Sequence, residues 1–363
     1  MDTTAINITF DKRGYCSFCE SFLLKVKENT SYKFNSDSLL KFVTKIKKNG
    51  HGKDYDCIIG ISGGVDSSWA LVKAVELGLR PLAVHMDNGW NSELAQNNIS
   101  NLITKLNVDL YTHVIEWDEY RMLMQSFFDA DVVDVELLYD NAMRAVNWRM
   151  ASKFKLKYIL SGVNTATEGM NMPRDWNWNK CDVRNIKAIA RRFTNTKIKT
   201  FPAVGTVKYF LHLLTGKRWV PFLDYFEYNK TNVTNELIKS YNYKPYPYKH
   251  YESVFTRFYQ GYILPKKFNI DKRRLHLSNL IVSGQLERED AIRQLSKIPY
   301  PSEEELKIDM EYFLKKMNWN QEQLDYYIAR PPVRHDEYPT EKNLIVLIKI
   351  MNRLIRMYER KSS

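Results

Sequence analysis

Short apolar runs alternate with amphipathic stretches between residues 54 and 162. The apolar runs are rich in β-branched and aliphatic residues, which favours buried strands. They lie at residues 57–61, 82–86, 110–115 and 158–161. Apolar residues recur at helical spacing in the intervening stretches, at residues 67–77, 92–106, 117–129 and 140–155. This alternation predicts a doubly wound α/β fold with a parallel sheet, whose ligands bind at the carboxyl ends of the strands.

The pattern changes on both sides of this core. Residues 6–10 alternate like a strand, residues 36–50 predict an amphipathic helix, and the tyrosine- and proline-rich residues 241–251 favour irregular structure. Further helices are predicted at residues 182–192, 255–263, 273–283, 287–295, 303–317 and 341–359. We therefore expect three parts: an N-terminal module at 1–33, a core at 34–170, and a substrate- or partner-binding region with a helical C-terminal appendage at 171–363.

Composition excludes several classes of protein. With 44% hydrophobic and 13% aromatic residues, the chain of 363 residues is globular rather than disordered. No run is long and apolar enough to cross a bilayer, and no signal-peptide core is present, so we expect a cytoplasmic protein with no membrane partner. The net charge of +12 fits either an anionic partner or a solvated basic surface.

One glycine turn joins the first predicted strand to the first predicted helix. It reads Ser62-Gly63-Gly64-Val65-Asp66-Ser67. Free N–H groups and the positive end of a helix dipole make such a turn an anion site, most often for phosphate. It is no Walker loop, because neither Gly52-Lys53 nor Gly216-Lys217 is followed by Ser or Thr. The glycine spacing does not match the dinucleotide fingerprint either.

Two further loops follow strands at the same expected sheet edge. Asp87 and Asn88 come after the second strand, where they could contact adenine, ribose or the magnesium of ATP. Gly162, Asn164 and Thr165 come after the fourth strand, where small polar residues could approach the α-phosphate or a second substrate. Each stretch alone reads equally well as an ordinary loop.

The hexapeptide resembles the pyrophosphate loop of the ATP pyrophosphatases, which include GMP synthetase, NAD synthetase, asparagine synthetase and the tRNA-thiolation enzymes. The resemblance implies that the loop holds the β- and γ-phosphates while ATP is cleaved to AMP and pyrophosphate. It also implies that Asp66 binds Mg²⁺. The ATP-binding residues would be Ser62, Gly63, Gly64, Val65, Asp66, Ser67, Asp87, Asn88 and Gly162. The alternative is a structural glycine turn without a ligand.

A closer resemblance covers about residues 2–330. The loop is followed in one order by the segments 164–169, 181–187 and 257–268, then by Asp271-Lys-Arg and His276-Leu-Ser278. This ensemble resembles the bacterial N-acetyl sugar amidotransferases of the lipopolysaccharide O-antigen and the pseudaminic or legionaminic acid pathways. Such enzymes convert an acetamido group on a sugar or nucleotide sugar into an acetamidino group through an adenylated intermediate. The resemblance also implies partners, a glutaminase subunit and a cyclase-like ammonia-channel subunit similar to those of imidazole glycerol phosphate synthase.

This interpretation assigns roles to individual residues. Asp66, Ser67 and Glu168 are the candidate catalytic residues, with Glu168 orienting the acetamido group or ammonia. A larger set is expected to contact the substrate: Asn164, Thr165, Trp176, Arg184, Lys249, Arg257, Lys266 and Lys267. For the basic members of this set the alternative is a solvated basic face, and for Trp176 it is a packed lid.

Cys16 and Cys19 form a C-x-x-C pair near the N-terminus. The pair is half of a zinc site, a redox pair or two unrelated thiols, because structural zinc normally needs four ligands. Members of the resembling family usually carry another C-x-x-C shortly before a Met-Asp-Thr-like segment, whereas this sequence starts at Met1-Asp2-Thr3. The zinc hypothesis therefore lacks two ligands.

Two other functions compete with a sugar amidotransferase. A tRNA-modifying enzyme with the same loop, of the lysidine or thiolation type, fits the positive charge. Thiolation usually needs paired cysteines near the loop, and Cys57 and Cys181 do not form such a pair in the sequence. A non-catalytic nucleotide-binding scaffold is the third option, and the intact Asp66 and Ser67 argue against it. Nucleic acid is therefore not the expected partner.

Overall fold

The computed structural model describes all residues except 30–35, 195–196, 248–250, 349 and 352–363. A five-stranded sheet forms its centre, in the order β3-β2-β1-β4-β5, and every neighbouring pair is parallel. The strands are β1 (Cys57–Gly60), β2 (Pro81–Asp87), β3 (Leu110–Val114), β4 (Tyr158–Ser161) and β5 (Arg218–Pro221). The predicted doubly wound α/β fold is confirmed, and β5 is an additional strand that the sequence pattern did not reveal.

Alternate strand residues face opposite layers of helices. On one side Ile59 and Leu160 pack in a cluster with residues of α2 (Ser36–Gly50), α3 (Val65–Glu76), α4 (Glu93–Leu106) and α10 (Lys230–Tyr241). On the other side Ile58 and Ile159 join residues of α5 (Trp117–Asp129) and α6 (Leu137–Lys153). Both faces of the strands β1, β2 and β4 are covered, which is why these strands read as apolar runs, whereas the edge strand β3 is partly exposed.

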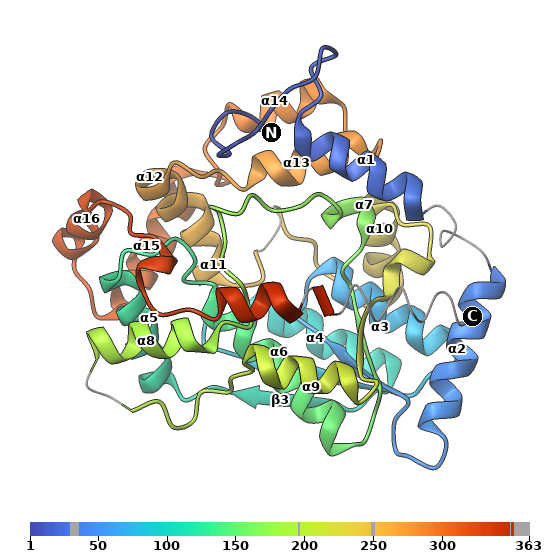
Figure 1. Cartoon of the computed structure of the whole chain (residues 1–363). Helices are drawn as coiled ribbons and strands as arrows, with labels where there is room; N and C mark the ends of the chain where they lie inside the picture. Colours follow the sequence, from blue (N-terminus) through green and yellow to red (C-terminus); the bar gives the residue numbers. More distant parts are fainter. Residues whose placement is uncertain (30–35, 195–196, 248–250, 349, 352–363) are drawn as a thin grey trace.

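The remaining described elements are almost all helical. They are α1 (Ser17–Asn29), α7 (Thr165–Glu168), α8 (Val183–Phe193), α9 (Thr206–Leu214), η2 (Phe222–Tyr225), α11 (Val254–Phe258), the π-helix η3 (Tyr259–Ile263), α12 (Leu264–Phe268), α13 (Arg273–Val282), α14 (Arg288–Leu295), α15 (Glu303–Met317), α16 (Gln321–Ala329) and η4 (His335–Glu337). In Figure 1 the elements α11 to α16, in orange and red, lie across the top and left of the molecule. The N-terminal α1 contacts α13.

Two sequence predictions need correction or remain open. The predicted strand at 6–10 is wrong: Asn7 has a left-handed φ of 62°, and only an isolated bridge joins Phe10 to Cys16. The N-terminal module instead contains the helix α1. The helix predicted at 341–359 falls largely outside the described residues, although residues 342–348 are helical.

The strand order indicates where on the sheet a ligand would bind. From β1 the chain adds β2 and β3 on one side, and then returns to add β4 and β5 on the other side of β1. Ligands of open α/β sheets bind outside the carboxyl ends of the strands at such a switch point. The loop after β1 and the segment after β4 both lie there. No described helix is long and apolar enough to span a membrane.

Candidate nucleotide site

The glycine turn after β1 is held in a conformation that only glycine permits. Gly63 has a φ of +84°, and a Cβ at this position would lie 2.7 Å from the carbonyl oxygen of Ala95. Gly64 is the N-cap of α3 and offers no side chain to the first-turn N–H groups of that helix. These groups, at the positive end of a helix of 12 residues, are therefore suited to an anionic ligand.

Two serine hydroxyls fix the shape of the turn. Ser67 Oγ lies 3.2 Å from Ser62 Oγ and accepts the N–H of Ser62 at 3.2 Å. Ser62 Oγ in turn accepts the N–H of Gly64 at 3.3 Å. Both ends of the hexapeptide are thus tied together before any ligand binds, which lowers the cost of ordering it.

A cavity of about 280 Å³ opens over this turn. Its wall comes from the loop, from the ends of β1 and β4, from α6 and α7, and from the segment 230–252. Three carboxylates line it, those of Asp66, Glu168 and Glu252, together with one ammonium group, that of Lys230. The sequence placed Asp66 and Glu168 in one site, and the structure brings them to the same cavity.

Asp66 is held by two polar neighbours. The Tyr228 hydroxyl donates a hydrogen bond to Asp66 Oδ1, and the Asn164 amide lies 3.5 Å from the same oxygen. Burial and then the negative charge of Asp66 raise the pKa of Tyr228 far above its usual value. The phenol therefore stays protonated and keeps donating to the carboxylate across the physiological pH range.

Gly162 allows the end of β4 to touch the start of α3. A Cβ at Gly162 would lie 2.4 Å from the carbonyl carbon of Asp66 and 2.6 Å from the nitrogen of Ser67. Both contacts are to backbone, which cannot move aside without shifting the loop. Gly162 therefore sets the position of the loop, in addition to lining the cavity.

Asn164 and Thr165 anchor the short helix that presents Glu168. Asn164 is 2% exposed, and its Oδ1 accepts the N–H of Thr167 at 2.9 Å. Thr165 donates its N–H to Asp224 Oδ1 at 2.6 Å and its hydroxyl to Asp224 Oδ2 at 3.1 Å. Both side chains are used in holding α7, while Glu168 is exposed and reaches the cavity.

The predicted nucleotide contacts after β2 occupy a turn. Asp87 Oδ1 accepts the N–H of Gly89 at 2.8 Å, and the buried Asn88 accepts the N–H of Trp90 at 3.2 Å. Neither residue is among those lining the cavity. Their contact with ATP stays a prediction.

Sequence reasoning missed the residues that close the site from the far side. Tyr246 donates its hydroxyl to the carbonyl of Gly63 at 3.2 Å. Glu252 lies close to Gly64: a Cβ added at Gly64 would be 2.0 Å from Glu252 Oε1. Tyr228 and Lys230 come from the same part of the chain. Tyr246 lies in the segment 241–251, which the sequence predicted only to be irregular, whereas Tyr228, Lys230 and Glu252 lie outside it and carried no prediction.

Three of the predicted substrate contacts are structural residues instead. Trp176 is 0% exposed, so its ring faces are covered by the core. Arg257 forms an ion pair with Asp309 and lies over the ring of Tyr251. Lys267 has a fully buried side chain that pairs with Asp131 at 2.9 Å and donates to two backbone carbonyls. The buried Lys267 and the partly buried Arg257 are thus each engaged by a carboxylate of the protein itself.

Two other predicted basic contacts do not line the cavity over the glycine turn, which we call the nucleotide cavity. Arg184 on α8 and Lys266 on α12 are exposed and do not line it. Lys249 lies outside the described residues.

Cys16 and Cys19 do lie together, with their Sγ atoms 3.3 Å apart. The hydrogen bond with Cys19 lowers the pKa of the Cys16 thiol to about 6. A thiolate is what a metal would require. Within the described ranges, however, no group of three or more His, Cys, Asp or Glu residues could hold a metal ion. Zinc binding stays a prediction for a half-site.

One family model matches part of the chain. Residues 252–354 are similar to the family described as "LPS biosynthesis protein WbpG-like, C-terminal domain". No curated protein matches the chain. The matched region contributes Glu252 to the cavity described above.

Several solved structures also match. An NMN synthetase from Francisella tularensis matches at 15% identity and a TM-score of 0.30, over 58% of this chain and 96% of the other. An NH3-dependent NAD synthetase from Campylobacter jejuni matches at 12% identity and a TM-score of 0.29, over 73% and 97%. A 4-thiouridine synthetase in complex with RNA and ATP matches at 15% identity and a TM-score of 0.30, over 52% and 42%. Scores this low do not define equivalent residues.

Proposed function

We propose that this chain is an ATP-dependent amidotransferase that converts a sugar acetamido group into an acetamidino group in bacterial surface polysaccharide biosynthesis, in the cytoplasm. The observation that carries the proposal is the Ser62–Ser67 turn at the switch point of the sheet, over a cavity that also contains Asp66 and Glu168. The match of residues 252–354 to a lipopolysaccharide biosynthesis family supports a saccharide substrate.

The chemistry follows from the weakness of an amide as an electrophile. The amide oxygen attacks the α-phosphorus of ATP, the bond to the β-phosphate breaks, and pyrophosphate leaves. Loss of the amide proton gives an O-adenylated imidate. Ammonia adds to the imidate carbon, the C–O bond to AMP breaks, and an amidine forms. One ATP and one ammonia therefore yield one amidine, one AMP and one pyrophosphate.

The loop stabilises the leaving group in this scheme. The first-turn N–H groups of α3 and the hydroxyls of Ser62 and Ser67 bind the phosphates whose charge increases as pyrophosphate departs. Lys230 adds a positive charge from the opposite wall. Glu168 orients the acetamido group or the ammonia that replaces its oxygen.

The acidic groups of the cavity fit magnesium. Mg²⁺ prefers oxygen ligands and is usually held by one or two carboxylates plus the substrate phosphates. Asp66 is the carboxylate that would hold it, since this residue adjoins the phosphate loop. Bound there, the ion would neutralise phosphate charge.

The nitrogen would come from partner subunits. Cys57 is buried in β1 and Cys181 is also buried, and burial raises the pKa of both thiols. Neither is suited to act as the nucleophile of a glutaminase, which needs an accessible thiolate. We therefore propose that a glutaminase and a cyclase-like ammonia-channel subunit supply the ammonia.

Product analysis tests the proposal. The purified chain is incubated with ATP, Mg²⁺, acetamido sugars and ammonium salt at alkaline pH, and the nucleotides are separated by chromatography. We expect AMP and pyrophosphate in equal amounts, with ADP absent. ADP as the main product would overturn the proposal. Glutamine should replace ammonium only when the two partner subunits are added, and efficient use of glutamine by this chain alone would refute the partner requirement.

A further inference from the structure

A second cavity of about 840 Å³ lies apart from the phosphate loop. Its walls come from the N-terminal module, the segment 171–178, the end of α12 and the segment 332–336. This volume is within the range of cavities that bind small ligands. None of the residues that line the nucleotide cavity also lines this one.

The region that matches the lipopolysaccharide family builds one side of this second cavity. Phe268, Ile270 and all five residues of 332–336 lie within 252–354 and line it. The same region contributes only Glu252 to the nucleotide cavity. Of the two cavities, the matched region therefore contributes mainly to the second.

The cavity wall offers polar groups that the protein itself does not use. Among the described residues, the guanidinium of Arg174, the carboxylate of Asp175 and the amide of Asn177 have no hydrogen-bond or ion-pair partner. All three are at least partly exposed. Together they provide donors and acceptors at one wall, which is what a ligand rich in hydroxyl groups requires.

The charges of the described lining residues cancel. The charged side chains among them are Arg174, Arg334, Asp175 and Asp336. Arg334 already binds Asp336 through two hydrogen bonds of 2.8 and 2.9 Å. A diphosphate would meet as many carboxylates as guanidinium groups, so the lining favours a neutral ligand.

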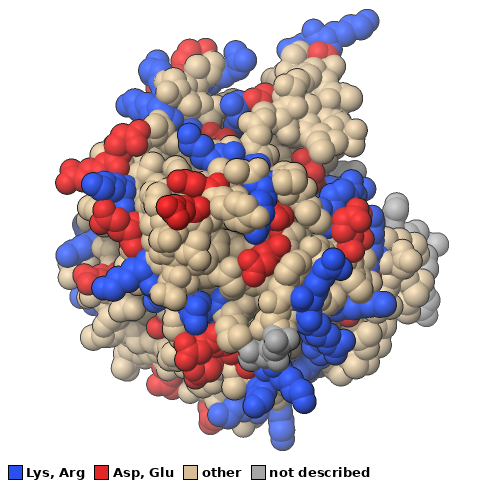
Figure 2. Space-filling view, turned by 90° about the vertical axis from the view of Figure 1, so that its left-hand side faces the viewer, with Lys and Arg blue, Asp and Glu red and all other residues tan. Residues whose placement is uncertain are grey.

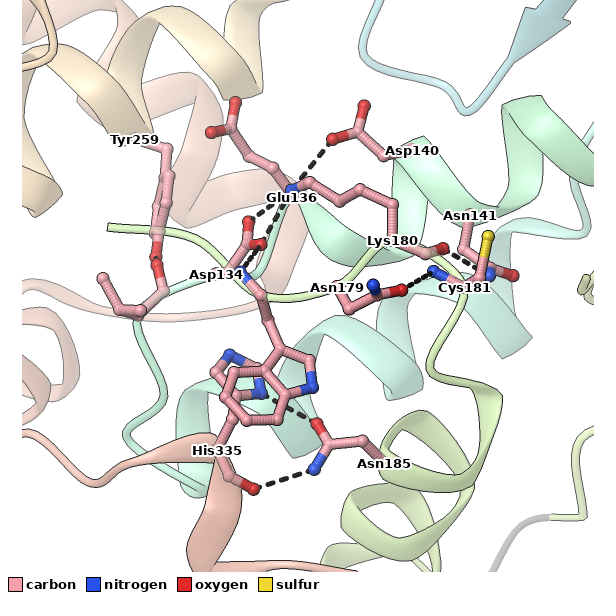
Figure 3. A network of polar contacts seen from close by, with 12 residues as sticks. Asp134, Glu136, Asp140, Asn141, Asn179, Lys180, Cys181, Asn185, Tyr259 and His335 are labelled. Carbon is pink, nitrogen blue, oxygen red and sulfur yellow. Dashed lines mark hydrogen bonds and ion pairs between the residues drawn. The ribbon is translucent and has the colours of Figure 1, made fainter. Parts of the chain in front are cut away.

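A rigid aromatic ring completes the wall. Trp178 donates its backbone N–H to Asp134 at 2.7 Å and its indole N–H to Asp182 at 3.0 Å. Its ring stacks on His335, with centroids 5.0 Å apart and planes 11° from parallel. Figure 3 shows His335 held by Asn185, and Lys180 between Asp134 and Asp140. The partly exposed indole is thus fixed before a ligand arrives.

We propose that this second cavity binds a neutral saccharide. An amphipathic sugar presents C–H faces to rings such as Trp178 and hydroxyl groups to amides and carboxylates such as Asn177 and Asp175. The sequence analysis named Trp176 as the substrate contact, but the indole that lines the cavity is Trp178, and Trp176 is buried.

The two cavities are close enough for one acceptor to reach both. Glu168 lines the first and Asn171 lines the second, and three residues of chain span at most ~11 Å. In the proposed reaction, on which this step rests, the reacting acetamido group lies near Glu168. The rest of the saccharide occupies the second cavity.

Saturation-transfer NMR on the full chain tests the site, with N,N′-diacetylchitobiose as the probe and UDP as a competitor. We expect transfer to the disaccharide, and the addition of UDP should not reduce it. The double variant Asp175→Ala, Asn177→Ala should weaken disaccharide binding by about tenfold, the effect of losing two hydrogen bonds. The matched control Asn97→Ala, an exposed residue of α4 that lines neither cavity, should bind as the wild type does.

The variant Ser67→Ala separates this proposal from the proposed function. It should lose pyrophosphate release while still binding the disaccharide, because Ser67 lines only the nucleotide cavity. The absence of transfer to the disaccharide, loss of that transfer when UDP is added, or unchanged binding by the double variant would each overturn the saccharide site. A chain that binds the disaccharide but makes no AMP would refute the amidotransferase and leave the saccharide site standing.

Discussion

At the scale of single residues, the geometry of the site depends on the carboxylate of Asp66 and on the absence of a side chain at Gly162. Asp66 reaches the cavity from the first turn of α3, where Tyr228 and Asn164 donate to a single oxygen. Gly162 brings the end of β4 against the backbone of the same turn. The contacts that define both positions are made with residues far away in the sequence.

Replacing Asp66 by Asn should abolish most of the activity without unfolding the protein. The amide oxygen can still accept from Tyr228 and Asn164, while the negative charge that we assign to magnesium binding is lost. We expect the rate of pyrophosphate release to fall by about 10²- to 10³-fold, with an unchanged circular dichroism spectrum. Asp118→Asn, an exposed acid in the first turn of α5, is the control. A folded Asp66→Asn protein with nearly the wild-type rate would remove Asp66 from the mechanism.

Replacing Gly162 by Ala should damage both stability and activity. The new Cβ would lie 2.4 Å from the carbonyl carbon of Asp66, so β4 and the loop must move apart. We expect a loss of about 1–3 kcal/mol in the free energy of unfolding and a lower rate of pyrophosphate release. At Gly205, where the nearest atom would be 3.6 Å away, the same substitution should leave that rate unchanged. Wild-type behaviour of Gly162→Ala in urea denaturation and turnover would contradict the close approach.

At the scale of elements, the segment 171–178 is fixed by contacts distant in the sequence. It packs through Trp178 on His335 of η4, and Asn185 of α8 binds His335 Nδ1 at 2.8 Å. Asn185 donates its own amide to the carbonyl of His335 at 2.9 Å, so the amide oxygen accepts from the ring. His335 therefore carries its proton on Nδ1 and is held as a neutral imidazole.

This neutral histidine should make the protein sensitive to acid. Burial lowers the pKa of His335 from 6.5 to about 4, so the unfolded chain binds a proton more readily than the folded one. The stability that the neutral ring provides is complete above pH 6.5 and is lost as the pH falls towards 4. The wild type should lose about 3 kcal/mol more than His335→Gln between pH 7 and 4. Urea denaturation at both pH values measures this difference, and equal losses would disprove it.

At the scale of the whole molecule, aromatic side chains join the C-terminal helices to the α/β core. Phe313 of α15 is fully buried. Its ring centroid lies 6.1 Å from that of Trp90, which follows β2, and 5.8 Å from that of Phe128 of α5. It also lies 4.9 Å from Phe258 of α11. One cluster thus contains residues from the core and from the C-terminal region, so the two should unfold together.

Phe313→Ala tests this coupling. Removing the ring should cost about 3–5 kcal/mol because the surrounding rings cannot close the cavity. Ile308→Ala, an exposed position on the same helix, should cost less than about 1 kcal/mol. Calorimetry should show a single transition at lower temperature for Phe313→Ala. Two transitions, with only one of them shifted, would mean that the C-terminal region unfolds independently.

The surface charge does not form a uniform basic face in the view of Figure 2. Lys and Arg side chains there are interspersed with Asp and Glu, despite the net charge of +12. Nucleic acid binds to contiguous positive surface. This face therefore gives no support to a tRNA substrate.

The sequence by itself determined the fold class and the position of the glycine turn. Both depend on local patterns: apolar runs of strand length, helical periodicity between them, and a glycine turn directly after β1. The predicted helices at 117–129 and 303–317 match α5 and α15 because their periodicity and their ends are encoded within the segment.

Only the tertiary structure decided which other residues share the site. Tyr228, Lys230 and Glu252 reach the loop from about 160 to 190 residues away, and no spacing in the sequence encodes that distance. Arg257 and Lys267 looked like ligands for an anion, but long-range packing gave each a carboxylate partner and buried Lys267. Trp176 and Trp178 are indistinguishable by sequence, and packing buried one ring while leaving the other at the cavity wall. A local pattern can specify a turn or a helix, whereas burial and ion pairing depend on segments that meet only when the chain folds.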